Sequence, residues 1–306
     1  MMPPPKGFSW SASRGRVLED CPRAYFFQYY LALGRVETGD RERIREAKRL
    51  KKLKTVPMWI GSSVHDAVEK MLREARDGQP ADLDRSIDEM IATMRRDYRE
   101  SFGDVSGGTR FLEHEYGHDV PNERWRRDTS DAKAMVSAFS AMPYLEEVRA
   151  AGRERLLALE NLEQWYFEGV PIWVRIDLAY RAADGEVHIL DWKTGRMQRG
   201  QNPLQMTGYA AYAEKAWGVA PEELAVREVY LRQADDSAEK WCTIDAGALE
   251  EARNGIRASV DEMLQLLRDP KSNVAHEPDF EPLPEPRKCG RCFFQGICPA
   301  SAAERA

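Results

Sequence analysis

A change in the spacing of apolar residues near position 155 constrains the fold most strongly. Before this position apolar side chains recur every three or four residues, as on one face of a helix. After it they alternate, and residues 155–167, 170–180 and 186–193 are predicted to form three strands. Turns at Glu168-Gly169 and Asp184-Gly185 join these strands. The sequence therefore predicts a β-meander that follows a helical region.

The rest of the chain is predicted to add helices and two further strands, which gives an α/β protein. Residues 226–232 and a short segment through Trp241 are expected to be strands, and residues 100–129 a connection rich in glycine and charge. The spacing of apolar residues predicts helices over 11–33, 58–76, 83–99, 130–151, 201–217 and 246–268. We therefore expect a mixed, mostly antiparallel sheet flanked by helices.

Composition and the N-terminal segment indicate a cytoplasmic protein. The 306 residues are 42% hydrophobic and 31% charged, which is ordinary for a globular chain. No stretch approaches the about 18 apolar residues that span a bilayer, and residues 1–10 lack the apolar core of a secretion signal. In a reducing compartment, the five cysteines are more readily metal ligands than disulfide partners.

Positive charge is concentrated near the N-terminus although the net charge is -6. Between Lys6 and Lys54 there are 13 Lys or Arg residues against 6 Asp or Glu, a local charge of +7, which leaves -13 for the rest of the chain. The densest part is Arg41 to Lys54. Two interpretations remain open, a solvated helix face and an arm that contacts nucleic-acid phosphates.

The strongest catalytic pattern is Asp177 followed by Asp191-Trp192-Lys193 at the end of a predicted strand. Asp191 and Lys193 leave the same face of the sheet, and the hairpin can return Asp191 beside Asp177. Two adjacent carboxylates repel each other unless a cation holds them, and oxygen ligands of this kind suit Mg²⁺ or Mn²⁺. The lysine would then orient a water or neutralise charge on a phosphate. A D-x-K by itself is a common sequence, so further residues must support this interpretation.

Three such residues lie on predicted helices. Gln205 and Tyr209 are four residues apart and so project from one helix face. His65, beside the apolar stripe of the helix at 58–76, could supply an imidazole to the metal.

Together the segments GSSVHDAVE, RIDLAY, ILDWKTG and QMTGY, within residues 61–209, resemble the ordered motifs of the RecB-like PD-(D/E)XK nucleases. The resemblance implies the restriction-endonuclease-like core of that family, with Lys193 as a catalytic residue and Gln205 and Tyr209 in support. The implied metal ligands are His65, Asp177, Asp191 and the backbone carbonyl of Trp192. Asp191 stands where the family often has Glu, and Glu160 on the first strand is a further candidate for the cluster.

Four cysteines are predicted to form a second metal site. Cys289, Cys292 and Cys298 form C-x2-C-x5-C followed by proline, and Cys21 supplies a fourth thiol from the other end of the chain. Cys242 remains as an ordinary strand cysteine. The spacing does not separate structural Zn²⁺ from an iron–sulfur cluster. The pattern resembles the iron–sulfur subgroup that contains the AddB nuclease domain and the CRISPR-associated RecB-like exonucleases, which implies [4Fe–4S].

A competing motif is H-E-x-x-H, formed by His114-Glu115-Tyr116-Gly117-His118. This zinc-protease pattern requires a helix that places both imidazoles on one face. Gly117 between the histidines and Pro121 after them make such a helix unfavourable. We therefore expect these histidines to lie in a connecting segment.

These observations favour three regions and one principal function. The regions are an N-terminal helical part (1–57), a nuclease core (58–269) with a helical insertion at about 80–151, and a cluster-binding tail (270–306). The resemblance implies a DNA exonuclease that acts on single-stranded ends with metal-activated water, in recombination, repair or CRISPR adaptation, encoded by a bacterium or a phage. The alternative is a nucleic-acid-binding subunit of such a complex in which cleavage is secondary.

Overall fold

The computed structural model describes residues 7–37, 40–197, 203–233 and 238–303. The chain forms two compact units. Residues 1–53, 164–174 and 253–306 make the first unit, and residues 54–163 and 175–252 make the second.

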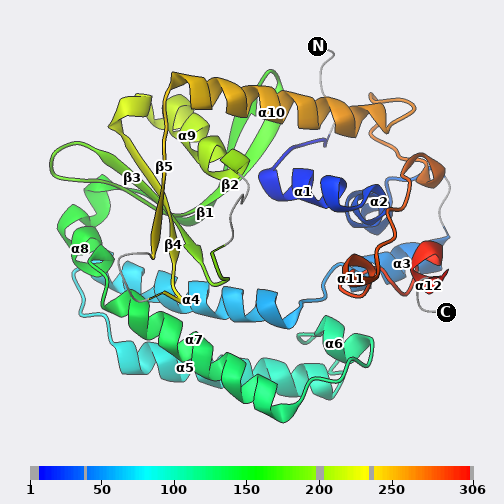
Figure 1. Cartoon of the computed structure of the whole chain (residues 1–306), viewed down its shortest axis with the longest axis horizontal. Coiled ribbons are helices and arrows are strands. Elements are labelled where there is room, and N and C mark those ends of the chain that lie inside the picture. The colour runs from blue at the N-terminus through cyan, green and yellow to red at the C-terminus, as the bar shows by residue number, and fades with distance from the viewer. Residues whose placement is uncertain (1–6, 38–39, 198–202, 234–237, 304–306) are drawn as a thin grey trace. The chain divides into compact units, whose positions relative to one another are not determined.

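Within the described residues the sheet is mixed, as expected, and its five strands are hydrogen-bonded in chain order. Strand β2 pairs with β3 antiparallel, β3 with β4 parallel, and β4 with β5 antiparallel (Figure 1). The ends of β1 and β2 that face their common turn belong to the first unit, and the rest of the sheet to the second. The strands are β1 (Leu156–Phe167), β2 (Val170–Arg181), β3 (Val187–Lys193), β4 (Leu224–Tyr230) and β5 (Glu239–Cys242).

Helices cover both faces of the sheet in the second unit (Figure 1). On one face α4 (Val56–Arg76) packs against α5 (Leu83–Phe102), α7 (Asn122–Ser140) and α8 (Tyr144–Arg155). The opposite face carries α9 (Pro203–Trp217); residues 201 and 202, where this helix was expected to begin, lie outside the described residues. The predicted apolar stripe of α4 is at most 1% exposed and consists of Val64, Val68, Met71 and Leu72. Burial of this stripe against the sheet fixes the helix that carries His65.

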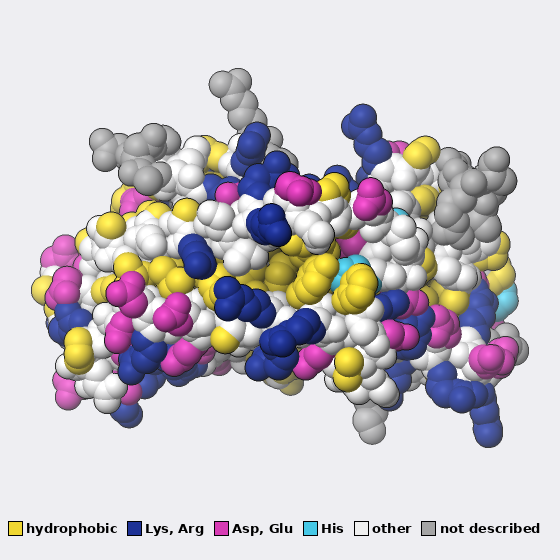
Figure 2. Space-filling view, turned by 90° about the horizontal axis from the view of Figure 1, so that it is seen from below, with side chains coloured by type: hydrophobic (Ala, Val, Ile, Leu, Met, Phe, Trp, Pro, Cys, Tyr) yellow, Lys and Arg dark blue, Asp and Glu magenta, His cyan; other side chains and the backbone are white. Residues whose placement is uncertain are grey.

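The outer side of this helical layer carries both basic and hydrophobic side chains. Figure 2 shows Lys and Arg side chains beside hydrophobic ones over the helices α5 and α7. The exposed basic residues of these helices include Arg95, Arg96, Arg99, Arg124, Arg126 and Arg127.

Two helix boundaries in this region were predicted wrongly. Residues 100–129 were expected to be a connection, yet they contain the short helix α6 (Leu112–Glu115) and the first turns of α7, which begins after Pro121. The polar sequence of these turns concealed their buried residues, among them Trp125. The helix expected over 130–151 is interrupted at residues 141–143, where Pro143 cannot continue the hydrogen-bonding pattern of α7.

The first unit is built from short helices at both ends of the chain. They are α1 (Ala12–Asp20), α2 (Pro22–Tyr29), η1 (Leu31–Leu33), α3 (Arg41–Leu50), η3 (Glu277–Asp279), α11 (Pro286–Cys289) and α12 (Pro299–Ala303). The long helix α10 (Ala246–Gln265) gives residues 246–252 to the second unit and the rest to the first. In the second unit, η2 (Pro221–Glu223) precedes β4.

The single helix expected over residues 11–33 is broken at Cys21. Cys21 has extended backbone angles, with φ at -168° and ψ at 112°. The cause is Pro22, because the ring of a proline disfavours the helical conformation of the residue before it. The break leaves Cys21 as the residue that separates α1 from α2.

Aromatic packing joins the two chain ends within the first unit. The ring of Phe280 lies 5.3 Å from that of Phe26 and 5.6 Å from that of Tyr30, and Phe27 lies 5.5 Å from Phe294. All five side chains are at most 1% exposed. Burial of these rings holds the C-terminal tail against α2.

Among the described residues, no helix is both long and apolar enough to cross a lipid bilayer.

Candidate functional site

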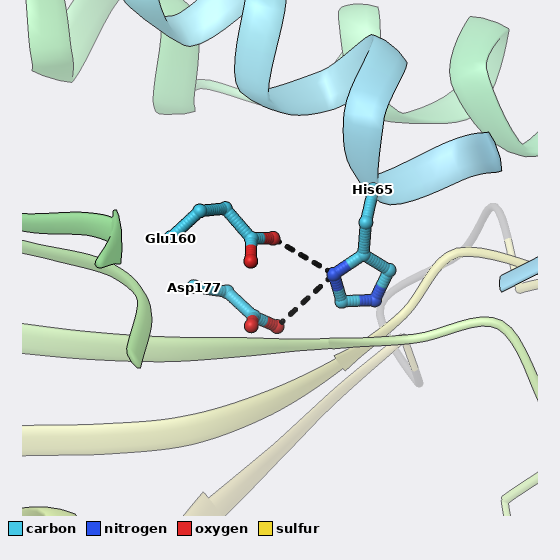
Figure 3. Close-up of side chains that lie close together, drawn as sticks. All are labelled: His65, Glu160 and Asp177. Carbon is cyan, nitrogen blue, oxygen red and sulfur yellow. Dashed lines mark hydrogen bonds and ion pairs between the residues drawn. The ribbon is translucent and has the colours of Figure 1, made fainter. Parts of the chain in front are cut away.

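A histidine and two carboxylates from three different elements meet in the second unit (Figure 3). His65 of α4 points toward Glu160 of β1 and Asp177 of β2, and one potential ligand atom of each lies within 4.8 Å of the others. Nδ1 of His65 is 2.8 Å from Oε1 of Glu160 and 3.7 Å from Oδ2 of Asp177. An imidazole between two carboxylates is a donor set that can hold a divalent ion.

The hairpin register brings the second aspartate to this centre. Leu178 pairs with Leu190, and Asp177 and Asp191 are the next residues along β2 and β3. The backbone N–H of Trp192 donates to Oδ2 of Asp177 at 2.7 Å, and the Trp192 carbonyl lies 3.2 Å from Nε2 of His65. Both aspartates are buried, at 5% and 4% exposure. Thus the four groups proposed from the motifs lie in one place.

The residues of the lysine and Q-x-x-x-Y motifs surround Asp191. Lys193 Nζ is 2.5 Å from Asp191 Oδ2 and donates to Gln205 Oε1 at 3.3 Å. Gln205 Nε2 and the Tyr209 hydroxyl both donate to Asp191 Oδ1, at 2.9 and 3.1 Å. Helix α9 can supply both groups because residues four apart share a face. Every oxygen of Asp191 is therefore already engaged by a polar partner.

The electrostatics of the site indicate a place for added positive charge. Burial and the neighbouring Asp191 charge raise the pKa of Asp177 well above its usual value. Burial alone would lower the pKa of His65, but its hydrogen bond to Glu160 and the Asp177 charge raise it to about 9. Burial likewise opposes ionisation of Lys193, whose pKa is nevertheless raised by Asp191. Without a metal ion, the bound protons and the Lys193 ammonium thus compensate the negative charge of the carboxylates. A divalent cation could compensate the same charge.

The backbone at Glu160 is unusual for a strand. Its φ of +52° lies in the left-handed region, which non-glycine residues adopt rarely. Side-chain alternation is also broken here, since Ala158 and Leu159 are both buried. This local distortion places the Glu160 carboxylate at the imidazole of His65, and the residue pattern of the strand gave no indication of it.

A third acidic side chain beside Lys193 was not predicted. Glu228 lies on β4 in register with Asp191 and is 3% exposed. Its Oε1 atom is 3.6 Å from Lys193 Nζ. The sequence gave no indication of this neighbour, because the pairing of β3 with β4 joins segments separated by α9.

The four cysteines of the predicted cluster line one cavity of about 440 Å³ in the first unit. They are free thiols, and aromatic side chains including Phe27 and Phe294 line the same cavity. Burial, together with the three neighbouring thiols, raises the pKa of Cys292 to about 12, because a second negative charge nearby is unfavourable. The cysteines are Cys21, Cys289, Cys292 and Cys298. Such a donor set fits a metal centre, which binds thiolates and compensates their charge.

The H-E-x-x-H segment does not form a protease helix. Helix α6 ends at Glu115, and Gly117 has a φ of +64°. His114 is engaged elsewhere, since its Nδ1 lies 2.7 Å from the hydroxyl of Ser101. The two imidazoles therefore do not share a helix face, as expected from the sequence.

A sequence model of the PD-(D/E)XK nuclease superfamily matches residues 9–299. The chain belongs to this superfamily. Membership makes the protein a metal-dependent nuclease, with DNA as the substrate that the family implies and divalent metal as its cofactor. The iron–sulfur subgroup is a finer assignment than this match provides.

Two of the solved structures that resemble this PD-(D/E)XK nuclease are an exonuclease-like protein and SSO0001. One is described as "Putative exonuclease" from Eubacterium rectale, with 12% identity, coverage of 97% of this chain and 88% of that chain, and a TM-score of 0.45. The other is SSO0001, with 16% identity, coverage of 62% and 92%, and a TM-score of 0.29. No curated protein matches the sequence significantly.

Proposed function

We propose that this PD-(D/E)XK nuclease is an exonuclease that degrades single-stranded DNA from its ends. The observation that carries the proposal is the convergence of His65 and Lys193 on the buried carboxylates of Asp177 and Asp191. These groups come from separate elements, so their meeting is a property of the fold and not of a local motif.

His65, Asp177, Asp191 and the Trp192 carbonyl would hold Mg²⁺ or Mn²⁺. The ion would activate water and neutralise charge on the phosphate, as divalent ions do in phosphoryl chemistry. Glu160 would accept a hydrogen bond from the Nδ1–H group of His65. This contact would hold the imidazole ring so that Nε2 faces the Trp192 carbonyl. We assign Glu160 a positioning role on this basis.

Lys193 would contact the scissile phosphate from beside the metal. Its ammonium is partly buried, with 20% of the side chain exposed, and its pKa is raised despite burial, so it stays charged. Gln205 holds Lys193 through its carbonyl and Asp191 through its amide, while the Tyr209 hydroxyl restrains Asp191. These contacts keep the ammonium and the carboxylate at fixed positions before substrate arrives.

We also propose a [4Fe–4S] cluster on Cys21, Cys289, Cys292 and Cys298, with structural Zn²⁺ as the alternative. The roomy cavity and its four thiols support a cluster-sized group. Protein purified without oxygen should be brown and absorb near 400 nm, and Cys292→Ser should remove the absorbance. Colourless protein with one equivalent of zinc would refute the iron assignment.

The nuclease function would serve recombination, repair or CRISPR-adaptation-like DNA processing, in the cytoplasm of a bacterium or a phage-infected host. The basic helix α3 is a candidate phosphate contact, because Arg41, Arg45 and Lys48 are exposed. Arg43 is not available for this role, since it forms an ion pair with Glu277. The alternative, a DNA-binding subunit with secondary cleavage, would use the same basic residues.

The test compares two single-stranded DNA substrates in the presence of Mn²⁺. One is linear and labelled at its end, and the other is a closed circle. We expect the wild type to degrade the linear strand and spare the circle, and Asp191→Ala to abolish degradation. Asp88→Ala, which removes an exposed carboxylate on α5, is the matched control and should cut normally. Undiminished cutting by Asp191→Ala would refute the site, whereas DNA binding without cutting by the wild type would favour the alternative.

A further inference from the structure

Glu228 shares the sheet face of the proposed active site. Strands β3 and β4 are parallel, with Asp191 in register with Glu228 and Lys193 in register with Tyr230. Side chains two apart on a strand lie on the same face, and so do registered neighbours. Glu228 is therefore the lateral neighbour of Asp191 on the face that carries Lys193.

The two oxygens of the Glu228 carboxylate have different partners. Oε2 accepts a hydrogen bond from the Tyr230 hydroxyl at 2.9 Å and another from Lys240 Nζ at 3.3 Å. Oε1 faces Lys193 Nζ at 3.6 Å. One oxygen is thus anchored by β4 and β5, while the other is directed at the lysine of the site.

The Glu228 carboxylate is buried, so its charge must be compensated by nearby positive groups. Glu228 is 3% exposed, and a buried carboxylate is costly unless positive groups compensate it. Lys240 supplies one compensating positive charge at Oε2. The orientation of Oε1 toward Lys193 gives the lysine a second carboxylate, next to its shorter contact with Asp191.

Lys193 needs such a second partner if Asp191 is to serve as a metal ligand. Both Asp191 oxygens are engaged, Oδ2 by Lys193 and Oδ1 by Gln205 and Tyr209. When Asp191 shares its charge with a divalent ion, its attraction for the ammonium weakens. At 3.6 Å, Glu228 is within ion-pair distance of the ammonium without any movement of the backbone.

We infer that Glu228 is a positioning residue of the nuclease site, which holds Lys193 in place when Asp191 takes up the metal. The inference rests on the proposed function. Glu228 touches neither metal nor substrate in this role, and it acts through Lys193.

The test compares Glu228→Gln with the wild type under Mn²⁺. We expect kcat on linear single-stranded DNA to fall roughly 10- to 100-fold with KM nearly unchanged, as for a misplaced catalytic group. Mn²⁺ affinity of the DNA-free protein, followed by electron paramagnetic resonance, should stay within about threefold of wild type, while Asp191→Asn should weaken it much more. Glu228→Asp, which keeps the charge, should restore part of kcat.

A double-mutant cycle separates positioning from a merely structural role. In a Lys193→Met background, measured in single turnover, Glu228→Gln should change the residual rate by less than about twofold. A further large loss in that background would show that Glu228 acts without Lys193 and would overturn the inference. If Glu228→Gln fails to fold because Lys240 loses its partner, Glu228→Gln with Lys240→Met removes both charges together.

Other outcomes are equally decisive. Wild-type kcat in Glu228→Gln would overturn the inference while leaving the nuclease function intact. A loss of Mn²⁺ affinity as large as that of Asp191→Asn would make Glu228 a metal ligand and would also overturn it. A wild-type protein that cuts no DNA would instead refute the proposed function itself.

Discussion

Binding of a divalent metal should displace a proton, so that the apparent metal affinity rises with pH. The hydrogen bond to Glu160 and the charge of Asp177 outweigh burial and raise the pKa of His65 to about 9. The imidazole is therefore protonated at neutral pH in the metal-free protein. A metal ligand must give up that proton, because the ion and the proton compete for the same lone pair.

The size of the effect follows from the pKa. At pH 7 only about 1% of the imidazole is neutral, which weakens apparent binding about 100-fold relative to pH above 9 and corresponds to about 2.7 kcal/mol. Affinity should rise about tenfold for each pH unit between 7 and 9. Burial and the Asp191 charge also raise the pKa of Asp177, so part of the released proton can come from that carboxyl group.

The assay is calorimetric titration with Mn²⁺ at pH 7 and pH 8 in HEPES and in Tris, whose ionisation enthalpies differ. The difference between buffers gives the number of protons released, and we expect about one at pH 7. Glu160→Gln should lower this number at pH 8, because it removes the charge that raises the His65 pKa, whereas Asp88→Ala should leave it unchanged. Binding without proton release at pH 7, or an affinity independent of pH between 6.5 and 8.5, would refute the reasoning.

Three further changes test the surroundings of the site. Tyr209→Phe removes a hydroxyl donated to Asp191, so kcat should fall by about tenfold while circular dichroism stays unchanged. Leu190→Ala opens a cavity at a fully buried strand position and should lower the free energy of unfolding by about 2–5 kcal/mol in urea; a loss below 1 kcal/mol would show that the core can close around it. Glu277→Gln removes the negative charge that pairs with two arginines in the first unit. It should lower the free energy of unfolding by about 1–3 kcal/mol, measured as a lower melting temperature. The control Glu123→Gln, at an exposed position, should leave the melting temperature unchanged.

The sheet was largely predictable because its signals are local. Alternating apolar residues and two short turns indicated β1 to β3, and the register follows once the turn at Asp184-Gly185 is fixed. The same local logic would have found the break at Cys21, since Pro22 was visible in the sequence. Helix α7 was harder, because its first turns are polar except at positions that only the packed structure shows to be buried.

Some residues of the candidate site were likewise predictable from local patterns, and others were not. Asp177, Asp191 and Lys193 could be brought together from strand period and hairpin geometry. His65 and Tyr209 required the order of family motifs, because no local rule says which face of a distant helix meets a strand. Glu160 could be named from its place on the first strand only as a further candidate, and Glu228 gave no usable signal.

By itself, the sequence determined most of the local structure of the chain, with the polar first turns of α7 as the main exception. The reason is that side-chain alternation, turn residues and the residue before proline act over a few positions. It also supplied the candidate ligands, two aspartates, a histidine and four cysteines, whose chemistry as donors does not depend on the fold. Only the tertiary structure decided which distant groups meet. The parallel pairing of β3 with β4 brings Glu228 beside Lys193, and a left-handed residue in β1 turns Glu160 to His65. Both depend on packing across the sheet, where the gain from burial outweighs the local preferences that sequence patterns record.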